Sequence, residues 1–126
     1  MIVLDANVLI AYWGDPDAHT DAALGILDTE EDLILHPVTL AESLVGPVRV
    51  GLEAEAMADY TRLGVERHVP LLDEPVQVAR LRSTTALKLP DVYVLATAIH
   101  LGATLATFDR RLADAARERG IDVLGA

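Results

Sequence analysis

The stretch Ile2-Val-Leu-Asp-Ala-Asn-Val-Leu-Ile10 places two apolar runs on either side of an acid, with no turn residue between them. We interpret Ile2–Asp5 as a buried strand that leads into a helix over Val8–Trp13, capped near Asn7. An acid that flanks an apolar strand is costly to bury unless something pairs with it. Asp5 is therefore the first candidate functional residue.

The rest of the chain continues this alternation of short apolar runs and helical segments. Further strands are predicted over Leu33–His36, Val69–Leu72, Ala103–Ala106 and Ile121–Leu124. Helices are predicted from Ala22 to about Asp28, and over Thr39–Val45, Leu52–Leu63, Val76–Leu87, Asp91–Leu101 and Arg110–Arg119. Gly46-Pro47 and Gly51 separate the helix that ends at Val45 from the next one. Strands that alternate with helices predict an α/β fold with a mainly parallel sheet, in one domain over 1–126.

The composition excludes several classes of protein. The chain has no cysteine, which rules out a disulfide framework, a thiolate zinc site and a cysteine nucleophile. No segment approaches the roughly 20 apolar residues of a membrane span. The first residues do not form a secretory signal, so we expect a cytoplasmic protein without a membrane partner.

The formal net charge of −10 comes from 20 acidic against 10 basic residues. Proteins that bind nucleic acid by passive phosphate neutralisation are usually basic, so this chain is not a simple groove binder. An acidic protein can still act on a phosphodiester when metal ions supply local positive charge. Nine of the ten basic residues are arginine, which suits bidentate phosphate contacts.

Four acids from distant parts of the chain are predicted to meet at one edge of the sheet. Asp5 ends the first strand, Glu42 lies in the first turn of the helix after the second strand, and Asp91 opens a later helix. Asp109 follows the fourth predicted strand by three residues. Sites in open parallel sheets lie outside the carboxyl ends of the strands. Oxygen ligands suit Mg2+ or Mn2+, which can hold an attacking water and offset charge on a leaving oxygen.

Each acid also has a structural interpretation. Thr39-Leu-Ala-Glu42 matches a capping box, in which Glu42 would only reach back to the Thr39 amide. Asp91 and Asp109 stand where carboxylates stabilise the starts of helices, and Asp5 could be a turn residue. From these residues alone both interpretations stay open.

Four segments together resemble the PIN-domain family, and most of all the VapC-type toxins of bacterial toxin–antitoxin pairs. The segments are Val3-Leu-Asp-Ala-Asn-Val-Leu-Ile10, Val38-Thr-Leu-Ala-Glu-Ser43, Leu89-Pro-Asp-Val-Tyr-Val-Leu-Ala-Thr-Ala98 and Ala106-Thr-Phe-Asp-Arg110. The resemblance covers essentially the whole chain. It implies a doubly wound parallel sheet flanked by helices on both faces, Mg2+ or Mn2+ dependence and endoribonuclease activity on RNA. It also implies a homodimer and inhibition by a cognate antitoxin.

The resemblance implies roles for particular residues. Asp5, Glu42 and Asp91 match the three principal acids of the family, and Asp109 matches its more variable fourth. Asn7 matches the position that supports the first aspartate, and Thr107 a hydroxyl next to the metal site. Asn7 could instead be a helix cap, and Thr107 an ordinary strand-end residue.

Basic residues that flank the acid-bearing segments are candidate phosphate contacts, although long charged side chains are mostly solvated. These residues are Arg82, Lys88, Arg110 and Arg111. The four histidines show no ligand spacing, and we assign them no chemistry. We expect an antitoxin and a second copy of the chain to bind near Val8–Trp13 and Leu52–Leu63, where apolar residues exceed what one small sheet can cover.

Two alternatives are weighed against the nuclease. A PIN-like fold that has lost catalysis would serve only as a binding module, and the complete acid set argues against it. A phosphoacceptor receiver domain would need paired acids after the first strand and a lysine near the last. Asp5 is unpaired, and the only lysine, Lys88, precedes Asp91.

Overall fold

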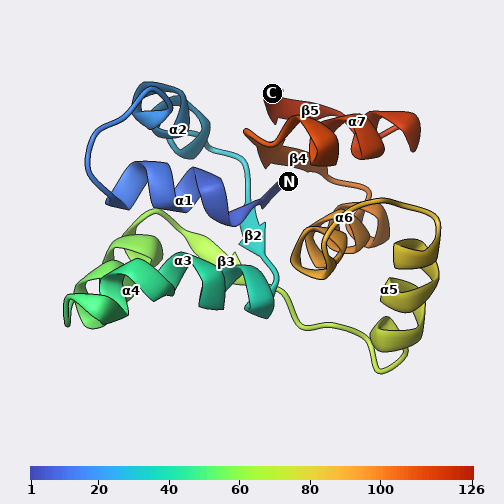
Figure 1. Ribbon diagram of the computed structural model, residues 1–126. Helices are drawn as coiled ribbons and strands as arrows, with labels where there is room; N and C mark the ends of the chain where they lie inside the picture. Colours follow the sequence, from blue (N-terminus) through green and yellow to red (C-terminus); the bar gives the residue numbers. More distant parts are fainter.

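Five short strands form one parallel sheet that is covered by helices on both faces (Figure 1). The computed structural model describes residues 1–126. In chain order the elements are β1 (Ile2–Leu4), α1 (Ala6–Trp13), α2 (Thr20–Leu27), β2 (Leu33–Leu35), α3 (Pro37–Arg49), α4 (Glu53–Arg62), β3 (Val65–Arg67), α5 (Glu74–Ser83), α6 (Leu89–Leu101), β4 (Thr104–Thr107), α7 (Arg110–Glu118) and β5 (Val123–Gly125). The predicted α/β fold with a doubly wound parallel sheet is confirmed.

The strand order β3-β2-β1-β4-β5 puts a topological switch point between β1 and β4. The chain builds outward from β1 to β2 and β3, then returns to the other side of β1 for β4 and β5. In open parallel sheets, ligands bind at such a point, outside the carboxyl ends of the strands. A receiver domain has the different strand order 2-1-3-4-5, so the sheet topology excludes that alternative.

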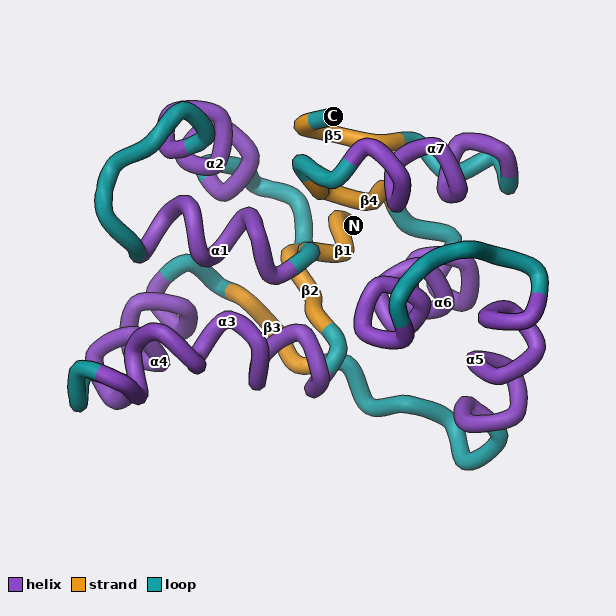
Figure 2. Tube along the Cα trace, in the orientation of Figure 1, coloured by secondary structure: helices purple, strands orange, loops and turns teal.

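Alternating side chains of the central strands pack into two separate hydrophobic cores. Ile2 and Leu4 of β1 enter the core beneath α1, α2 and α4, whereas Val3 enters the core beneath α5, α6 and α7. The strand β2 divides its residues in the same way. Figure 2 shows α1 to α4 on one side of the strands and α5 to α7 on the other. A strand buried on both faces reads as a continuous apolar run, which is why β1 and β2 were predictable from sequence.

The third strand differs from the prediction. It is β3, whose Val65 to Arg67 pair with β2 at the edge of the sheet. The predicted strand over Val69–Leu72 is wrong, because this segment is an exposed connection and Pro70 lacks an amide for a sheet hydrogen bond. Glu66 and Arg67 are exposed, so β3 lacks the apolar run that marks the buried strands.

Helix α3 continues through Gly46 and Pro47 to Arg49, where the sequence predicted a break. A proline inside a helix cannot donate to the carbonyl four residues earlier, here that of Ser43. The Tyr60 hydroxyl of α4 donates a hydrogen bond of 3.4 Å to this Ser43 carbonyl. The freed acceptor therefore has a partner from the neighbouring helix, and Pro47 is buried within the fold.

The exposed apolar residues lie largely outside the two segments predicted to bind partners. In α1, Val8, Leu9 and Ala11 are buried, and only Ile10 among its large aliphatic residues is well exposed. Leu52 is the exposed aliphatic residue of the second segment. Most of the others are at the end of α3 and around the start of α5; they are Val45, Val48, Val50, Val69, Leu71, Leu72 and Val76. No helix has the length and apolar character needed to cross a membrane.

Candidate active site

Asp5 and Asp109 lie at the carboxyl ends of the neighbouring strands β1 and β4. The two strands run in register, with Leu4 opposite Ala106, and the Asp5 amide donates to the Ala106 carbonyl at 2.9 Å. Each acid caps a helix: Oδ1 of Asp5 accepts from the Ala6 amide, and Oδ1 of Asp109 accepts from the Arg111 and Leu112 amides. The cap of α1 is therefore Asp5 and not Asn7 as predicted.

The Thr107 hydroxyl joins the two strand ends. It donates to Oδ2 of Asp5 at 2.7 Å and accepts from the Asp109 amide at 3.0 Å. Asn7 completes the network, because its Nδ2 donates to Thr107 Oγ1 and its Oδ1 accepts from the Phe108 amide, both at 3.3 Å. Thr107 has no exposed surface. The network fixes the orientation of the Asp5 carboxylate, which is itself only 5% exposed.

Glu42 and Asp91 come from helices on the two sides of the sheet. Asp91 is in the first turn of α6, as predicted. Glu42 is in the second turn of α3, because that helix starts at Pro37 and is capped by His36. The capping-box interpretation of Glu42 is therefore wrong: Thr39 lies inside the helix, and its buried Oγ1 has no hydrogen-bond partner. Glu42 is half-buried and is free of any capping role.

Burial, with mutual repulsion added to it, raises the pKa values of three of the carboxylates. Burial, followed by repulsion from Asp5 and Asp109, raises the pKa of Asp91 to about 6, with Lys88 opposing the shift. Burial also raises the pKa of Asp5 against the hydrogen bonds from Thr107 and Ala6. Burial raises the pKa of Glu42, with further contributions from Asp5 and Asp91. None of the four acids has an ion-pair partner.

A cleft of about 610 Å³ opens on three of the acids, Glu42, Asp91 and Asp109. Lys88, Arg110 and Arg111 line the same cleft, so cationic groups border the acidic cluster. Arg82, which was predicted to belong with them, does not line it; its guanidinium donates to the Thr85 carbonyl on the protein surface. Asp5 does not line the cleft and is buried at the end of β1.

The donor set fits a hard divalent cation. Its ligand atoms are carboxylate oxygens, and their mutual repulsion is what a bound cation would relieve. No three of these carboxylates stand close enough to coordinate one ion directly. Mg2+ usually keeps several waters and is held by one or two carboxylates together with substrate phosphates. The chemistry of the donors fits such an ion, although no three side chains form a direct coordination site.

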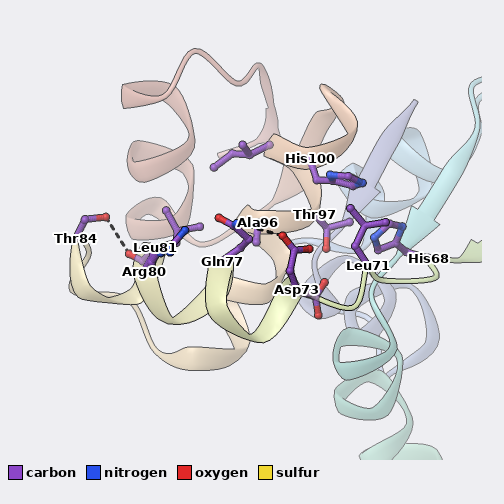
Figure 3. Close-up of a pocket in the computed structure, with 12 residues that line it drawn as sticks. His68, Leu71, Asp73, Gln77, Arg80, Leu81, Thr84, Ala96, Thr97 and His100 are labelled. Atoms are coloured by element: carbon purple, nitrogen blue, oxygen red, sulfur yellow. Dashed lines mark hydrogen bonds between the residues drawn. The ribbon is translucent and has the colours of Figure 1, made fainter.

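The histidines, which showed no ligand spacing in the sequence, include three that lie near one another. The ring centroid of His68 is 6.4 Å from that of His36 and 5.9 Å from that of His100. Burial lowers the pKa of His68, with His100 and His36 adding to the effect against Glu74. The group adjoins a second cavity of about 510 Å³ between α5 and α6, in which Figure 3 shows His68 and His100 beside Thr97. This cavity contains none of the four acids.

The fold matches known structures. The M. tuberculosis VapC20 toxin, described as sarcin–ricin loop cleaving, superposes with a TM-score of 0.76 at 16% identity over 91% of this chain and 95% of that one. A toxin–antitoxin complex from Klebsiella pneumoniae gives a TM-score of 0.75 at 23% identity, over 90% of each chain. VapBC2 from Rickettsia felis, bound to a promoter DNA fragment, gives 0.70 at 17% identity over 98% and 97%.

No curated protein sequence matches this chain. The family model described as PIN domain matches residues 2–118, a range that contains all four acids, Asn7 and Thr107. The similar structures are only 16–23% identical to this chain and show its fold alone. The family model, in contrast, spans nearly the whole chain. The chain belongs to the PIN-domain family.

Proposed function

We propose that this chain is an endoribonuclease that depends on a divalent metal ion. The observation that carries the proposal is the cluster of four carboxylates, without an ion-pair partner, at the switch point of a PIN-domain sheet. Structural acids are commonly satisfied by a cation or a capping role, and Glu42 has neither. A buried acid with a raised pKa in a cleft is a typical functional-site residue.

In this proposal Asp5, Glu42, Asp91 and Asp109 hold Mg2+ or Mn2+. When bound, such an ion offsets negative charge at the phosphodiester and makes an attacking water more acidic. Thr107 holds one oxygen of the Asp5 carboxylate in place, and Asn7 supports Thr107. Asp91 releases its proton near pH 6, so it is ionised and able to bind a cation at neutral pH.

Lys88, Arg110 and Arg111 are proposed to contact RNA phosphates. They line the same cleft as the acids, so a strand that reaches the acids passes them. The chain has a net charge of −10, which means that attraction for RNA has to come from this local border rather than from the whole surface. Arg82 is left out of this set because it is bonded to Thr85 away from the cleft.

We further propose that the chain is the toxin of a toxin–antitoxin pair and forms a homodimer. Support for the first comes from the similar structures, which include VapC20, VapBC2 and a toxin–antitoxin complex. Support for the second comes from the exposed aliphatic residues at the end of α3 and around the start of α5. Growth arrest on expression, relieved by a small neighbouring gene product, tests the first; light scattering tests the second. A monomer at high concentration would argue against the dimer.

The activity is tested by incubating total RNA with the purified protein in Mn2+ and in EDTA. We expect cleavage only with Mn2+, and none with Asp5→Asn. Asp114→Asn is the matched control, because Asp114 is an exposed acid of α7 that pairs with Arg117 and does not line the cleft, and it should cleave like wild type. Absence of cleavage by folded wild type with Mn2+ would favour the alternative of a catalytically silent binding module.

A further inference from the structure

His36 contacts three helices. It is only 3% exposed and lies between β2 and α3. Its Nδ1 accepts a hydrogen bond of 3.0 Å from the Val38 amide, which caps α3. A ring nitrogen that accepts is unprotonated, so the ring proton is on Nε2. Nε2 therefore donates to Oε1 of Glu74, the first residue of α5, at 2.7 Å.

The third helix is reached through an aromatic contact. The ring centroid of His36 is 4.7 Å from that of Tyr93, and the two planes are tilted by 34°. Tyr93 follows Asp91 by two positions in α6, and α6 packs against α3. The His36 imidazole therefore contacts both α3, which carries Glu42, and α6, which carries Asp91. Its hydrogen bond to Glu74 fixes the orientation of the ring.

We infer that His36, held by Glu74, is a positioning residue that sets the distance between Glu42 and Asp91; the inference rests on the proposed metal-dependent function. Glu42 in α3 and Asp91 in α6 repel each other, so the ionised carboxylates favour separation of these two helices. The cap, the hydrogen bond and the ring contact at His36 all oppose that separation. His36 touches neither RNA nor metal in this proposal and acts only through the helices.

The cap that His36 forms on α3 and its contacts with Glu74 and Tyr93 can be tested separately by substitution. His36→Asn keeps a side-chain oxygen that can cap α3, since Asn is a preferred N-cap, but loses the Glu74 and Tyr93 contacts. Glu74→Ala removes the anchor of the ring, whereas Glu74→Gln retains an oxygen that accepts from Nε2. His100→Ala is the matched control, because His100 belongs to the same histidine group but has no hydrogen bond to α3.

Mn2+ affinity is measured by titration calorimetry on each folded variant, beside circular dichroism and RNA cleavage. Metal sites lose about tenfold or more in affinity when supporting residues are removed. We expect His36→Asn and Glu74→Ala each to weaken Mn2+ binding by about tenfold. Glu74→Gln and His100→Ala should bind within about twofold of wild type, and the double variant His36→Asn/Glu74→Ala should bind no more weakly than the weaker single variant.

A purely structural role would lower the melting temperature of His36→Asn and Glu74→Ala while leaving the Mn2+ affinity of the folded protein unchanged. That result, with wild type binding Mn2+ and cutting RNA, would overturn the role of His36 and leave the proposed function standing. If folded wild type bound no Mn2+, the proposed function would fail, and the positioning role with it. If Glu74→Gln weakened Mn2+ binding as much as Glu74→Ala does, the positioning role of His36 would also be overturned. The charge of Glu74, rather than its hydrogen bond with His36, would then matter.

Discussion

Asp5 has two separable roles at the scale of a single residue: it caps α1, and it contributes charge to the acidic cluster. Asparagine caps a helix as well as aspartate does, and its oxygen can still accept from the Ala6 amide. The asparagine Nδ2 cannot accept from the Thr107 hydroxyl as Oδ2 of Asp5 does, but the substitution also removes a buried charge whose pKa burial raises. Because these two effects oppose each other, we predict that Asp5→Asn melts within a few degrees of wild type and loses RNA cleavage in Mn2+. The measurement is cleavage of total RNA beside circular dichroism. Cleavage at the wild-type rate would remove Asp5 from the metal site.

Thr107 supports Asp5 through a hydroxyl that makes three hydrogen bonds while fully buried. Thr107→Val keeps the shape and leaves buried polar partners unsatisfied, at a cost of about 1–3 kcal/mol in unfolding free energy. Chemical denaturation measures this loss. Thr104→Val is the control, because Thr104 begins the same strand but its side chain has no hydrogen bond. Equal losses in both variants would mean that the network contributes no specific stability.

The four acids, Asn7 and Thr107 could be nominated from the sequence because each lies in one of the four segments that resemble the PIN-domain family. His36 was not nominated, since its contacts with Glu74 and Tyr93 join residues far apart in the chain. One local signal was available: a polar residue directly before Pro37 marks a helix cap with proline at the first helical position. The same signal would have moved the start of α3 and removed the capping-box interpretation of Glu42.

At the scale of the element, α3 shows how a helix can include a proline. The carbonyl of Ser43 has no helical donor, because Pro47 lacks an amide hydrogen, and it accepts from the Tyr60 hydroxyl instead. Tyr60→Phe should therefore cost about 1 kcal/mol in unfolding free energy, because a buried carbonyl loses its partner. In a Pro47→Ala background the alanine amide can donate to Ser43, so the same substitution should cost less. Denaturation of the four proteins of this cycle gives the coupling.

A coupling of zero in that cycle would show that Tyr60 and Pro47 act independently.

The same helix explains why the sequence pattern failed here. Gly46-Pro47 is a strong local helix breaker, and the carbonyl that Pro47 leaves without a donor is satisfied only by Tyr60 of α4. The edge strand β3 fails for a related reason. Its pairing with β2 comes from the backbone, while its exposed Glu66 and Arg67 give no apolar signal.

At the scale of the whole molecule, the acidic edge makes stability depend on pH. The pKa of Asp91 is raised in the folded state from 3.8 to about 6, so the native state holds its proton more tightly than the unfolded chain does. The resulting penalty is absent below about pH 4, grows as the pH rises towards 6, and persists above it. Allowing for solvent screening, we expect about 1–2 kcal/mol from Asp91. Asp5 and Glu42, with pKa values raised in the same direction, add to it.

Denaturation in EDTA between pH 4 and pH 8 measures this dependence, with Asp91→Asn as the comparison. Wild type should lose more stability than the variant over the interval from pH 4 to pH 7. Protons and metal compete for the same carboxylates, so Mn2+ affinity should fall as the pH drops through about 6. A wild-type stability profile parallel to that of the variant would mean that Asp91 does not titrate with a raised pKa.

Removing the Asp91 charge should have opposite effects in the absence and in the presence of metal. In EDTA at pH 8, Asp91→Asn relieves the repulsion from Asp5 and Asp109 but gives up about 0.3–1 kcal/mol of favourable interaction with the start of α6. We expect it to melt at the wild-type temperature or up to about 5 °C higher. Wild type should gain about 2.7 kcal/mol at an Mn2+ concentration of 100 Kd. The variant should gain less than half of that at the same concentration, because one ligand is missing.

Two melting curves for each protein, one with EDTA and one with Mn2+, make this test. Asp114→Asn is again the matched control, since its exposed carboxylate belongs to an ion pair of α7 with Arg117 and should leave the Mn2+ gain unchanged. If Asp91→Asn gained as much from Mn2+ as wild type, Asp91 would act only on the start of α6. The metal would then be held by Asp5, Glu42 and Asp109 alone, and the raised pKa of Asp91 would reflect its burial and its neighbours without any part in binding the cation.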